Sequence, residues 1–195
     1  MTFPNRMRCV VTGSGSGLGR EFALALARRG ARVLGCDLNA DSAAATADQV
    51  RGAGGEALYQ GCDVGDIEQV EALADRARAE WGGVDLLINN AGVAVAGEVG
   101  VTSLQDWAWV VRVNLWGVIY GCHTFAPAMR AQGRGYILNV ASAAGLLTPP
   151  TLGPYNVTKA GVVALSETLH GEGRPDGLKV TVLCPTFFRT NLMDT

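Results

Sequence analysis

Apolar positions divide the chain into two kinds of segment that alternate. Short, nearly continuous apolar runs predict strands, at residues 7–12, 32–37, 56–60, 84–89, 136–140 and 179–184. Between them, apolar residues return every three or four positions, which predicts helices over residues 17–29, 41–51, 67–81, 103–129 and 154–170. Asp66 is expected to cap the third helix, Gly30 to end the first, and Pro127 to bend the long one.

This alternation predicts the fold class. Strands separated by helix-length segments form βαβ units with parallel pairing and right-handed crossovers. The run at 84–89 is apolar at almost every position, which is typical of a strand buried on both faces. Neither a linker-like stretch nor an internal repeat interrupts the pattern. We therefore expect one α/β domain over residues 1–195, a doubly wound parallel sheet (Rossmann fold) in three α/β/α layers.

Composition and charge narrow the possible partners. The chain has 195 residues, of which 48% are apolar and 17% charged, with a net charge of −2. This balance offers no general attraction to nucleic acid or to an acidic membrane face. No apolar run approaches the roughly 20 residues of a membrane-spanning helix, and residues 1–6 lack a secretion signal. We expect neither nucleic acid nor membrane as a partner.

The cysteines indicate a reducing compartment. There are five, at positions 9, 36, 62, 122 and 184, without a Cys-x-x-Cys pair and with only two histidines in the chain. Their number is odd and three of them lie in or beside apolar runs that predict strands, which favours buried thiols over disulfides or a zinc site. We expect a cytoplasmic protein without a bound metal.

A glycine-rich turn follows the first strand. Four glycines stand at alternate positions from Gly13 to Gly19, and a helix begins directly after them. Such a turn brings bare backbone N–H groups against an anion, and the positive end of the helix dipole points to the same place. A flexible serine–glycine loop is the alternative interpretation. The strand, turn and helix together favour a diphosphate site.

The other strand ends add candidate residues, because ligands of open parallel sheets bind outside the carboxyl ends of the strands. Asp37 ends the second strand, where its carboxylate could accept hydrogen bonds from both hydroxyls of an adenosine ribose and would repel a 2′-phosphate. The alternative is an ordinary acidic strand end. Coincidence with the glycine turn favours the ribose role.

Tyr155 and Lys159 form a second constellation. Four residues apart on a helix, they lie on one face, where the ammonium could favour the phenolate. The pair could then move a proton in an alcohol–carbonyl interconversion, with Ser142 at a strand end hydrogen-bonding the substrate oxygen. Each residue alone is a weak signal, since helix faces often carry such pairs. The hypothesis of a catalytic site rests on their common placement at the carboxyl edge of the sheet.

Together these motifs resemble the short-chain dehydrogenase/reductase family, from about Arg6 to Thr190. The resemblance rests on seven motifs in order, which are Thr12-Gly13-x-x-x-Gly17-x-Gly19, Asp63-Val64, Asn89-Asn90-Ala91-Gly92, Asn114, Ser142, Tyr155-x-x-x-Lys159 and Pro185-x-x-x-x-Thr190.

The resemblance implies roles for these residues. Tyr155 would be the acid/base, Lys159 would lower its pKa and bind the nicotinamide ribose, and Ser142 would orient the substrate oxygen. The backbone carbonyl of Asn114 would hold a water linked to the lysine. These four would be the catalytic residues. Cofactor contacts are implied for Gly13, Ser14, Ser16, Gly17, Leu18, Gly19, Asp37, Asp63, Val64, Asn90, Ala91, Gly92, Tyr155, Lys159, Pro185, Phe188 and Thr190.

The cofactor expected from the resemblance is NAD rather than NADP. Family members that use NADP usually carry a basic residue before the second glycine of the turn or just after the second strand. This chain has Ser16 and Leu38 at those positions, and Asp37 beside them.

The remaining pocket residues are mostly apolar, which favours a hydrophobic secondary alcohol or ketone as the small-molecule substrate. They lie at 93–96, 143–147, 149–150, 152 and 187. The three tryptophans of the long helix, at 107, 109 and 116, favour packing or subunit contact over a ligand box. Because helices that begin near Ser103 and Pro154 commonly pair in this family, a homodimer or homotetramer is expected.

Two departures from the family pattern concern the end of the chain. Thr186 stands where the family usually has glycine. Relatives typically continue for several dozen residues with a substrate loop and a seventh strand, so residues 180–184 would form an unpaired apolar sheet edge. We expect a C-terminally incomplete domain.

Two other functions stay open on the same fold. One is a dinucleotide-binding protein without turnover, and the other is epimerisation or dehydration through the same tyrosine.

Overall fold

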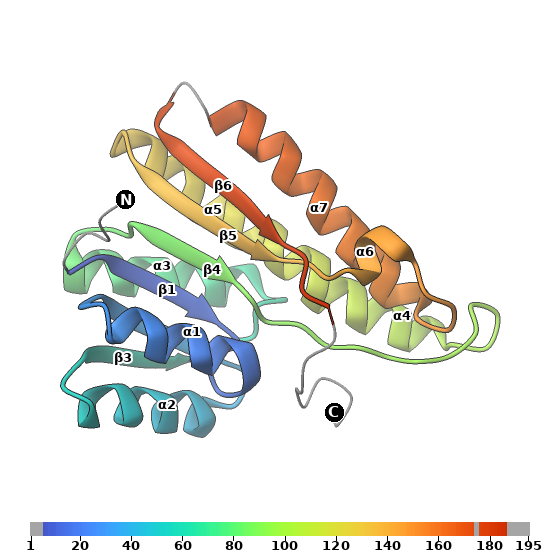
Figure 1. Ribbon diagram of the computed structural model, residues 1–195, viewed down its shortest axis with the longest axis horizontal. Coiled ribbons are helices and arrows are strands. Elements are labelled where there is room, and N and C mark those ends of the chain that lie inside the picture. The colour runs from blue at the N-terminus through green and yellow to red at the C-terminus, as the bar shows by residue number, and fades with distance from the viewer. Residues whose placement is uncertain (1–5, 174–175, 187–195) are drawn as a thin grey trace.

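A computed structural model describes residues 6–173 and 176–186 of the chain. It contains one sheet of six parallel strands in the order β3-β2-β1-β4-β5-β6 (Figure 1). The strands are β1 (Arg8–Thr12), β2 (Arg32–Asp37), β3 (Glu56–Gly61), β4 (Leu86–Asn89), β5 (Gly135–Val140) and β6 (Leu178–Leu183). The predicted doubly wound α/β domain is confirmed, with each strand within two residues of its expected bounds.

Helices cover the sheet from both sides. They are α1 (Gly17–Ala27), α2 (Ala40–Gly52), α3 (Ile67–Trp81), α4 (Leu104–Val111), η1 (Arg112–Trp116), α5 (Gly117–Ala131), α6 (Ala144–Leu147) and α7 (Gly153–Gly173). Figure 1 shows α1 and α2 in front of the sheet and α3 and α5 behind it. The strand order reverses between β1 and β4, so their carboxyl ends open the crevice in which such sheets bind ligands.

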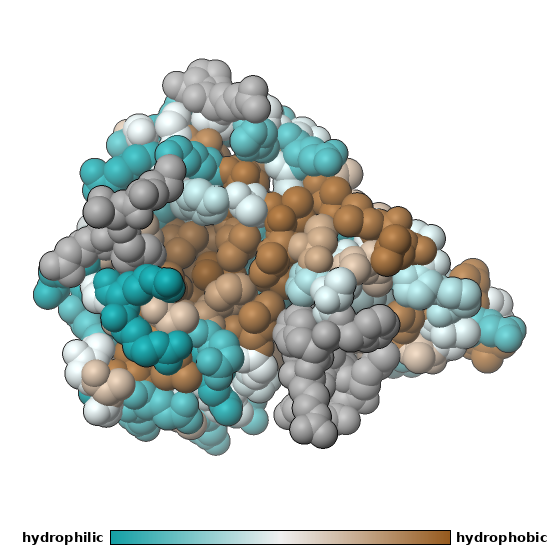
Figure 2. All heavy atoms as spheres, in the orientation of Figure 1, coloured by the Kyte–Doolittle hydropathy of each residue, from teal (hydrophilic) through white to brown (hydrophobic). Residues whose placement is uncertain are grey.

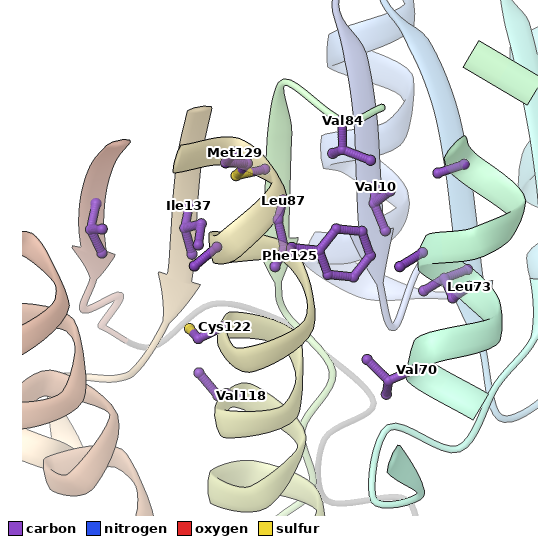
Figure 3. Close-up of a cluster of buried hydrophobic side chains, with 14 of the residues drawn as sticks. Val10, Val70, Leu73, Val84, Leu87, Val118, Cys122, Phe125, Met129 and Ile137 are labelled. Carbon is purple, nitrogen blue, oxygen red and sulfur yellow. The ribbon is translucent and has the colours of Figure 1, made fainter. Parts of the chain in front are cut away.

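The core lies in two layers because successive strand residues point to opposite faces. Val10 and Leu87 face the larger layer, which α3, α5 and α7 complete with residues such as Phe125 (Figure 3). Cys9 and Val11 face the other layer under α1. Strands buried on both faces explain why the sequence shows continuous apolar runs rather than alternation.

Local signals placed the helix ends correctly. The Asp66 carboxylate accepts a hydrogen bond from the backbone N–H of Glu68, which caps α3. Gly30, just beyond α1, has a φ of +81°, and its N–H donates to the carbonyl of Ala27.

Two elements were not predicted. The long helix expected over 103–129 contains a π-turn, η1, between α4 and α5, while α5 itself runs through Pro127. The short helix α6 follows β5, where only pocket lining was expected. Both lie next to candidate site residues.

The sheet ends at β6 within the described residues, as the sequence pattern led us to expect. Leu183 of β6 and Tyr136 of the neighbouring β5 are each 36% exposed, and Figure 2 shows hydrophobic residues gathered over the middle of the sheet, beyond the α1–α2 layer. In the described part of the chain, no helix combines the length and the apolar character that crossing a membrane requires.

Candidate active site

The glycine turn between β1 and α1 has the bare backbone that an anion site needs. Gly13 and Gly17 have φ values of +65° and +49°, a region that favours glycine. A Cβ on Gly19 would overlap the carbonyl oxygen of Gly13, so the start of α1 packs directly on the turn. Ser16 occupies the N-cap in an extended conformation, and its side chain makes no capping bond. The first N–H groups of α1 therefore lack a side-chain cap.

Asp37 lies against this turn. Its Oδ2 accepts a hydrogen bond from the N–H of Gly15 at 2.9 Å, and its Oδ1 accepts one from Asn39 at 3.1 Å. A Cβ on Gly15 would stand 2.8 Å from that Oδ2, so only glycine permits the approach. The end of β2 and the turn are thus joined, as expected of a shared site. Leu38, the next residue, is exposed.

The residues Asn90 to Gly92 follow β4 and support the turn from its other side. The Asn90 amide donates to the carbonyls of Thr12 at 2.9 Å and Gly13 at 3.2 Å. The Thr12 hydroxyl accepts hydrogen bonds from the N–H groups of Asn90 and Ala91. A Cβ on Gly92 would lie 3.5 Å from the Lys159 ammonium, which brings this loop to the second constellation.

Two arginines that sequence reasoning missed hold the same edge. Arg20 donates to the carbonyl oxygen of Gly15 and, at 3.2 Å, to the Thr46 hydroxyl, which in turn donates to the Ser14 carbonyl. Its place directly after the last glycine of the turn could have indicated it.

Arg112, the second, donates to Oδ2 of Asp63 at 2.6 Å. The other oxygen of Asp63 accepts from Gly65, and the neighbouring Val64 is buried against Gly117. Because Arg112 reaches Asp63 from the π-turn, no sequence pattern signals this contact.

Tyr155 and Lys159 lie on one face of α7, as predicted. The Lys159 ammonium stands 5.6 Å from the centre of the Tyr155 ring and donates to the Val140 carbonyl at 2.9 Å. Ser142 follows β5, and its hydroxyl accepts a hydrogen bond from the N–H of Ala144 at the start of α6. The structure therefore brings the end of β5 and the first turns of α7 together.

Electrostatics at this pair differ from the expectation. Burial raises the pKa of Tyr155, and hydrogen bonding with Ser142 opposes that rise. Burial also lowers the pKa of Lys159 to about 8, because a lysine only 3% exposed loses the hydration of its charged form. Desolvation therefore prevails in the pKa of Tyr155, and the expected lowering of that pKa by Lys159 stays a prediction.

Asn114 lies in the π-turn and is fully buried. Its Oδ1 accepts from the N–H of Val93 and its Nδ2 donates to the Val93 carbonyl, both at 2.8 Å. Nδ2 also lies 3.4 Å from the hydroxyl of Thr158, which donates to the Tyr155 carbonyl. The Asn114 side chain thus connects the loop after β4 with α7.

The last predicted cofactor segment is described only in part. The Pro185 carbonyl accepts a hydrogen bond from the N–H of Ala143, which places residue 185 beside the end of β5. Phe188 and Thr190, predicted to contact the cofactor, and Phe187, predicted to line the pocket, lie outside the described residues.

Residues 8–195 match the family described as short chain dehydrogenase. The chain is 39% identical over 183 residues to D-threitol dehydrogenase of Mycolicibacterium smegmatis, which covers 94% of this chain and 70% of that protein. It is 39% identical over 186 residues to the probable oxidoreductase EphD of Mycobacterium tuberculosis, covering 95% of this chain but 31% of that protein.

A solved structure shows the same fold over the whole chain. The crystal structure of a short chain dehydrogenase/reductase from Burkholderia phymatum in complex with NAD matches with a TM-score of 0.96 at 43% sequence identity. The match covers 100% of this chain and 70% of that one.

Proposed function

The chain belongs to the short-chain dehydrogenase/reductase family, and we propose on this premise that it is an NAD-dependent oxidoreductase that interconverts an alcohol and a ketone. One observation carries the proposal. A glycine turn suited to a diphosphate and a pair made of the partly buried Tyr155 and the buried Lys159 open on the same edge of the sheet. A dinucleotide lying along that edge would place its reactive end beside the phenol.

The residues present fit NAD. The turn is close-packed, since Cβ atoms at Gly15 and Gly19 would meet Asp37 and the Gly13 carbonyl, and the first N–H groups of α1 have no side-chain cap. Asp37 is the group proposed to accept from the adenosine ribose hydroxyls, which requires its present bond to Gly15 to be shared or exchanged. NAD bound here would supply the hydride acceptor. The Asp37 carboxylate disfavours a 2′-phosphate by charge repulsion. The residues before and after it, Cys36 and Leu38, carry no positive charge that could offset this repulsion.

Tyr155 is the proposed acid/base. In alcohol oxidation its phenolate oxygen would take the hydroxyl proton, and in ketone reduction the phenol would return it. A phenol with a raised pKa is a poor base, so a positive charge nearby is required to favour the phenolate. Lys159 lies where it can supply that charge, and Ser142 where its hydroxyl can donate to the substrate oxygen.

The proposed substrate is a hydrophobic secondary alcohol or the matching ketone. Its support is the apolar character of the segments predicted to line the pocket, where Leu146 and Leu147 of α6 are exposed at 61% and 76%. One similar protein is a dehydrogenase of D-threitol, a polyol, so both chemistries belong in the test.

A homo-oligomer and a reducing, cytoplasmic compartment complete the proposal. Trp116 in η1 is 47% exposed and packs its ring 5.4 Å from that of Tyr120, which offers apolar surface to a second copy. All five cysteines are described and carry free thiols, which fits a reducing environment.

The experiment that tests the proposed function is a panel of cyclic, aliphatic and polyhydroxy alcohols assayed with NAD, in which NADH absorbance is followed. Turnover supports the proposal, and inertness with every substrate in either direction contradicts it.

A further inference from the structure

Residues 148–152 connect α6 to α7 and lead directly into the helix that carries Tyr155. Two threonines in this segment have left-handed backbone, Thr148 with a φ of +46° and Thr151 with a φ of +66°. Residues with a branched side chain rarely adopt this conformation, and it persists only where surrounding contacts impose it.

Two neighbours hold this segment. From α7, Nδ2 of Asn156 donates to the carbonyl of Pro149 at 2.8 Å. From the loop after β4, the N–H of Gly97 donates to the carbonyl of Thr151 at 2.7 Å, and Gly97 also forms a parallel bridge with Leu152. The first contact uses a side chain, whereas those of Gly97 use backbone.

Asn156 is built into the helix next to the proposed acid/base. It follows Tyr155 directly and is 9% exposed. Its amide can point only one way, because a rotation by 180° would set Oδ1 against the carbonyl oxygen of Pro149. Its Oδ1 is buried and has no hydrogen-bond partner among the described residues. The bond from Nδ2 to Pro149 is thus the polar contact that anchors this side chain to the segment.

We propose that Asn156 is a positioning residue that sets the substrate specificity of the enzyme by fixing the segment 148–152 as a wall beside Tyr155. This inference rests on the proposed function. The wall is suited to discriminate by shape, since two consecutive prolines, Pro149 and Pro150, restrict its backbone and the segment bridges to Gly97. Loss of the hydrogen bond between Asn156 and Pro149 would let residues 148–152 change conformation without altering the glycine turn. The ranking of substrates would then change, while the affinity for NAD would not.

The test compares two substitutions with a matched control. Asn156→Leu keeps the approximate shape of the side chain and removes the donor without adding a charge, and Asn156→Ala removes the whole side chain beyond Cβ. Val157→Ala is the control, because Val157 is the next residue on α7 and is 55% exposed. For each variant, kcat/KM is measured over secondary alcohols of increasing size, together with the KM for NAD and the amide hydrogen exchange of residues 148–152.

We expect both Asn156 variants to compress the ratio between the best and worst alcohols by about tenfold, the discrimination that a well-fitted pocket gives for one or two methylene groups. The substrate KM should rise more than kcat falls, the KM for NAD should stay within about twofold, and exchange in the segment should accelerate. Val157→Ala should keep the wild-type ranking. If Asn156→Ala does not fold, the shape-matched Asn156→Leu decides.

An active wild type whose ranking of alcohols survives both substitutions overturns the inference alone. An equal loss of kcat/KM on every alcohol, accompanied by a higher KM for NAD, also overturns the inference, since that result indicates a general structural role of Asn156. Absence of wild-type turnover with every alcohol overturns the proposed function and the inference with it.

Discussion

The ammonium of Lys159 stands 5.6 Å from the centre of the Tyr155 ring and is bonded at 2.9 Å to the carbonyl of Val140, the last residue of β5. The pair is therefore fixed to the sheet rather than free on the helix surface. Burial pushes the pKa of Lys159 down and that of Tyr155 up, so it disfavours the charged form of each group.

This burial predicts a pH dependence of stability. The Lys159 pKa is about 8 in the folded chain and 10.5 when unperturbed, so between these values the unfolded chain binds more protons and stability rises with pH. Urea unfolding at pH 7 and pH 9 should show wild type gaining about 1 kcal/mol relative to Lys159→Met over that interval. Subtracting the variant removes the opposite contribution of buried thiols such as Cys122, whose pKa is raised to about 11. An identical pH dependence in both proteins would contradict the buried charge.

The glycine turn predicts a loss of cofactor affinity on a small substitution. Gly19→Ala should weaken NAD binding at least tenfold, because the added methyl meets the Gly13 carbonyl and must displace the turn. Gly171→Ala on α7 is the control, since its Cβ would have nothing within 4 Å. That control should leave affinity unchanged and stabilise the protein by about 0.5–1 kcal/mol. Isothermal titration with NAD, alongside urea unfolding, separates the two effects.

Asp37 predicts the choice between NAD and NADP. Asp37→Asn keeps a side-chain oxygen for the N–H of Gly15 and removes the charge, so it should raise kcat/KM with NADP relative to NAD by about tenfold. Asp37→Ala should erode the preference too, and weaken NAD further by freeing the turn. A wild-type preference for NADP would refute this role of Asp37.

A partly buried ion pair at the opposite edge predicts acid sensitivity. Arg8 donates to both oxygens of Asp85, at 2.7 and 2.6 Å, and the pKa of Asp85 falls to about 2 although burial alone would raise it. Because this pKa lies below the ordinary value of 3.8, the pair contributes fully above about pH 4 and is lost as pH falls toward 2. Asp85→Asn should cost about 3 kcal/mol at pH 7 in urea unfolding and remove that acid dependence.

The exposed pair of Asp75 and Arg78 provides the comparison for this experiment. Its side chains are 69% and 63% exposed, so Asp75→Asn should cost less than about 0.5 kcal/mol. Equal costs for the two substitutions would show that burial does not strengthen the Asp85 pair.

The strands and most helices could be predicted because their causes are local. The run at residues 84–89 is apolar as a doubly buried strand must be, and Asp66 carries its cap in its own side chain. The π-turn at Arg112–Trp116 could not, since its residues continue the helical pattern and its cause is tertiary, in the bonds that Asn114 makes to Val93.

The candidate site divides in the same way. Spacing placed Tyr155 and Lys159 on one face, but it could not report their burial, which raises the pKa of Tyr155 and lowers that of Lys159. Arg112 meets Asp63 across 49 positions of the chain, and the left-handed backbone of Thr151 depends on the neighbouring loop. These features arise only when distant segments pack.

The measurement that tests the central claim most directly is the rate of NADH formation with Tyr155→Phe beside wild type. The substitution keeps the ring over which Lys159 lies and removes only the hydroxyl proposed to move the proton. We predict a fall in kcat of at least about 100-fold, with NAD affinity retained. Equal rates in the two proteins would contradict the account.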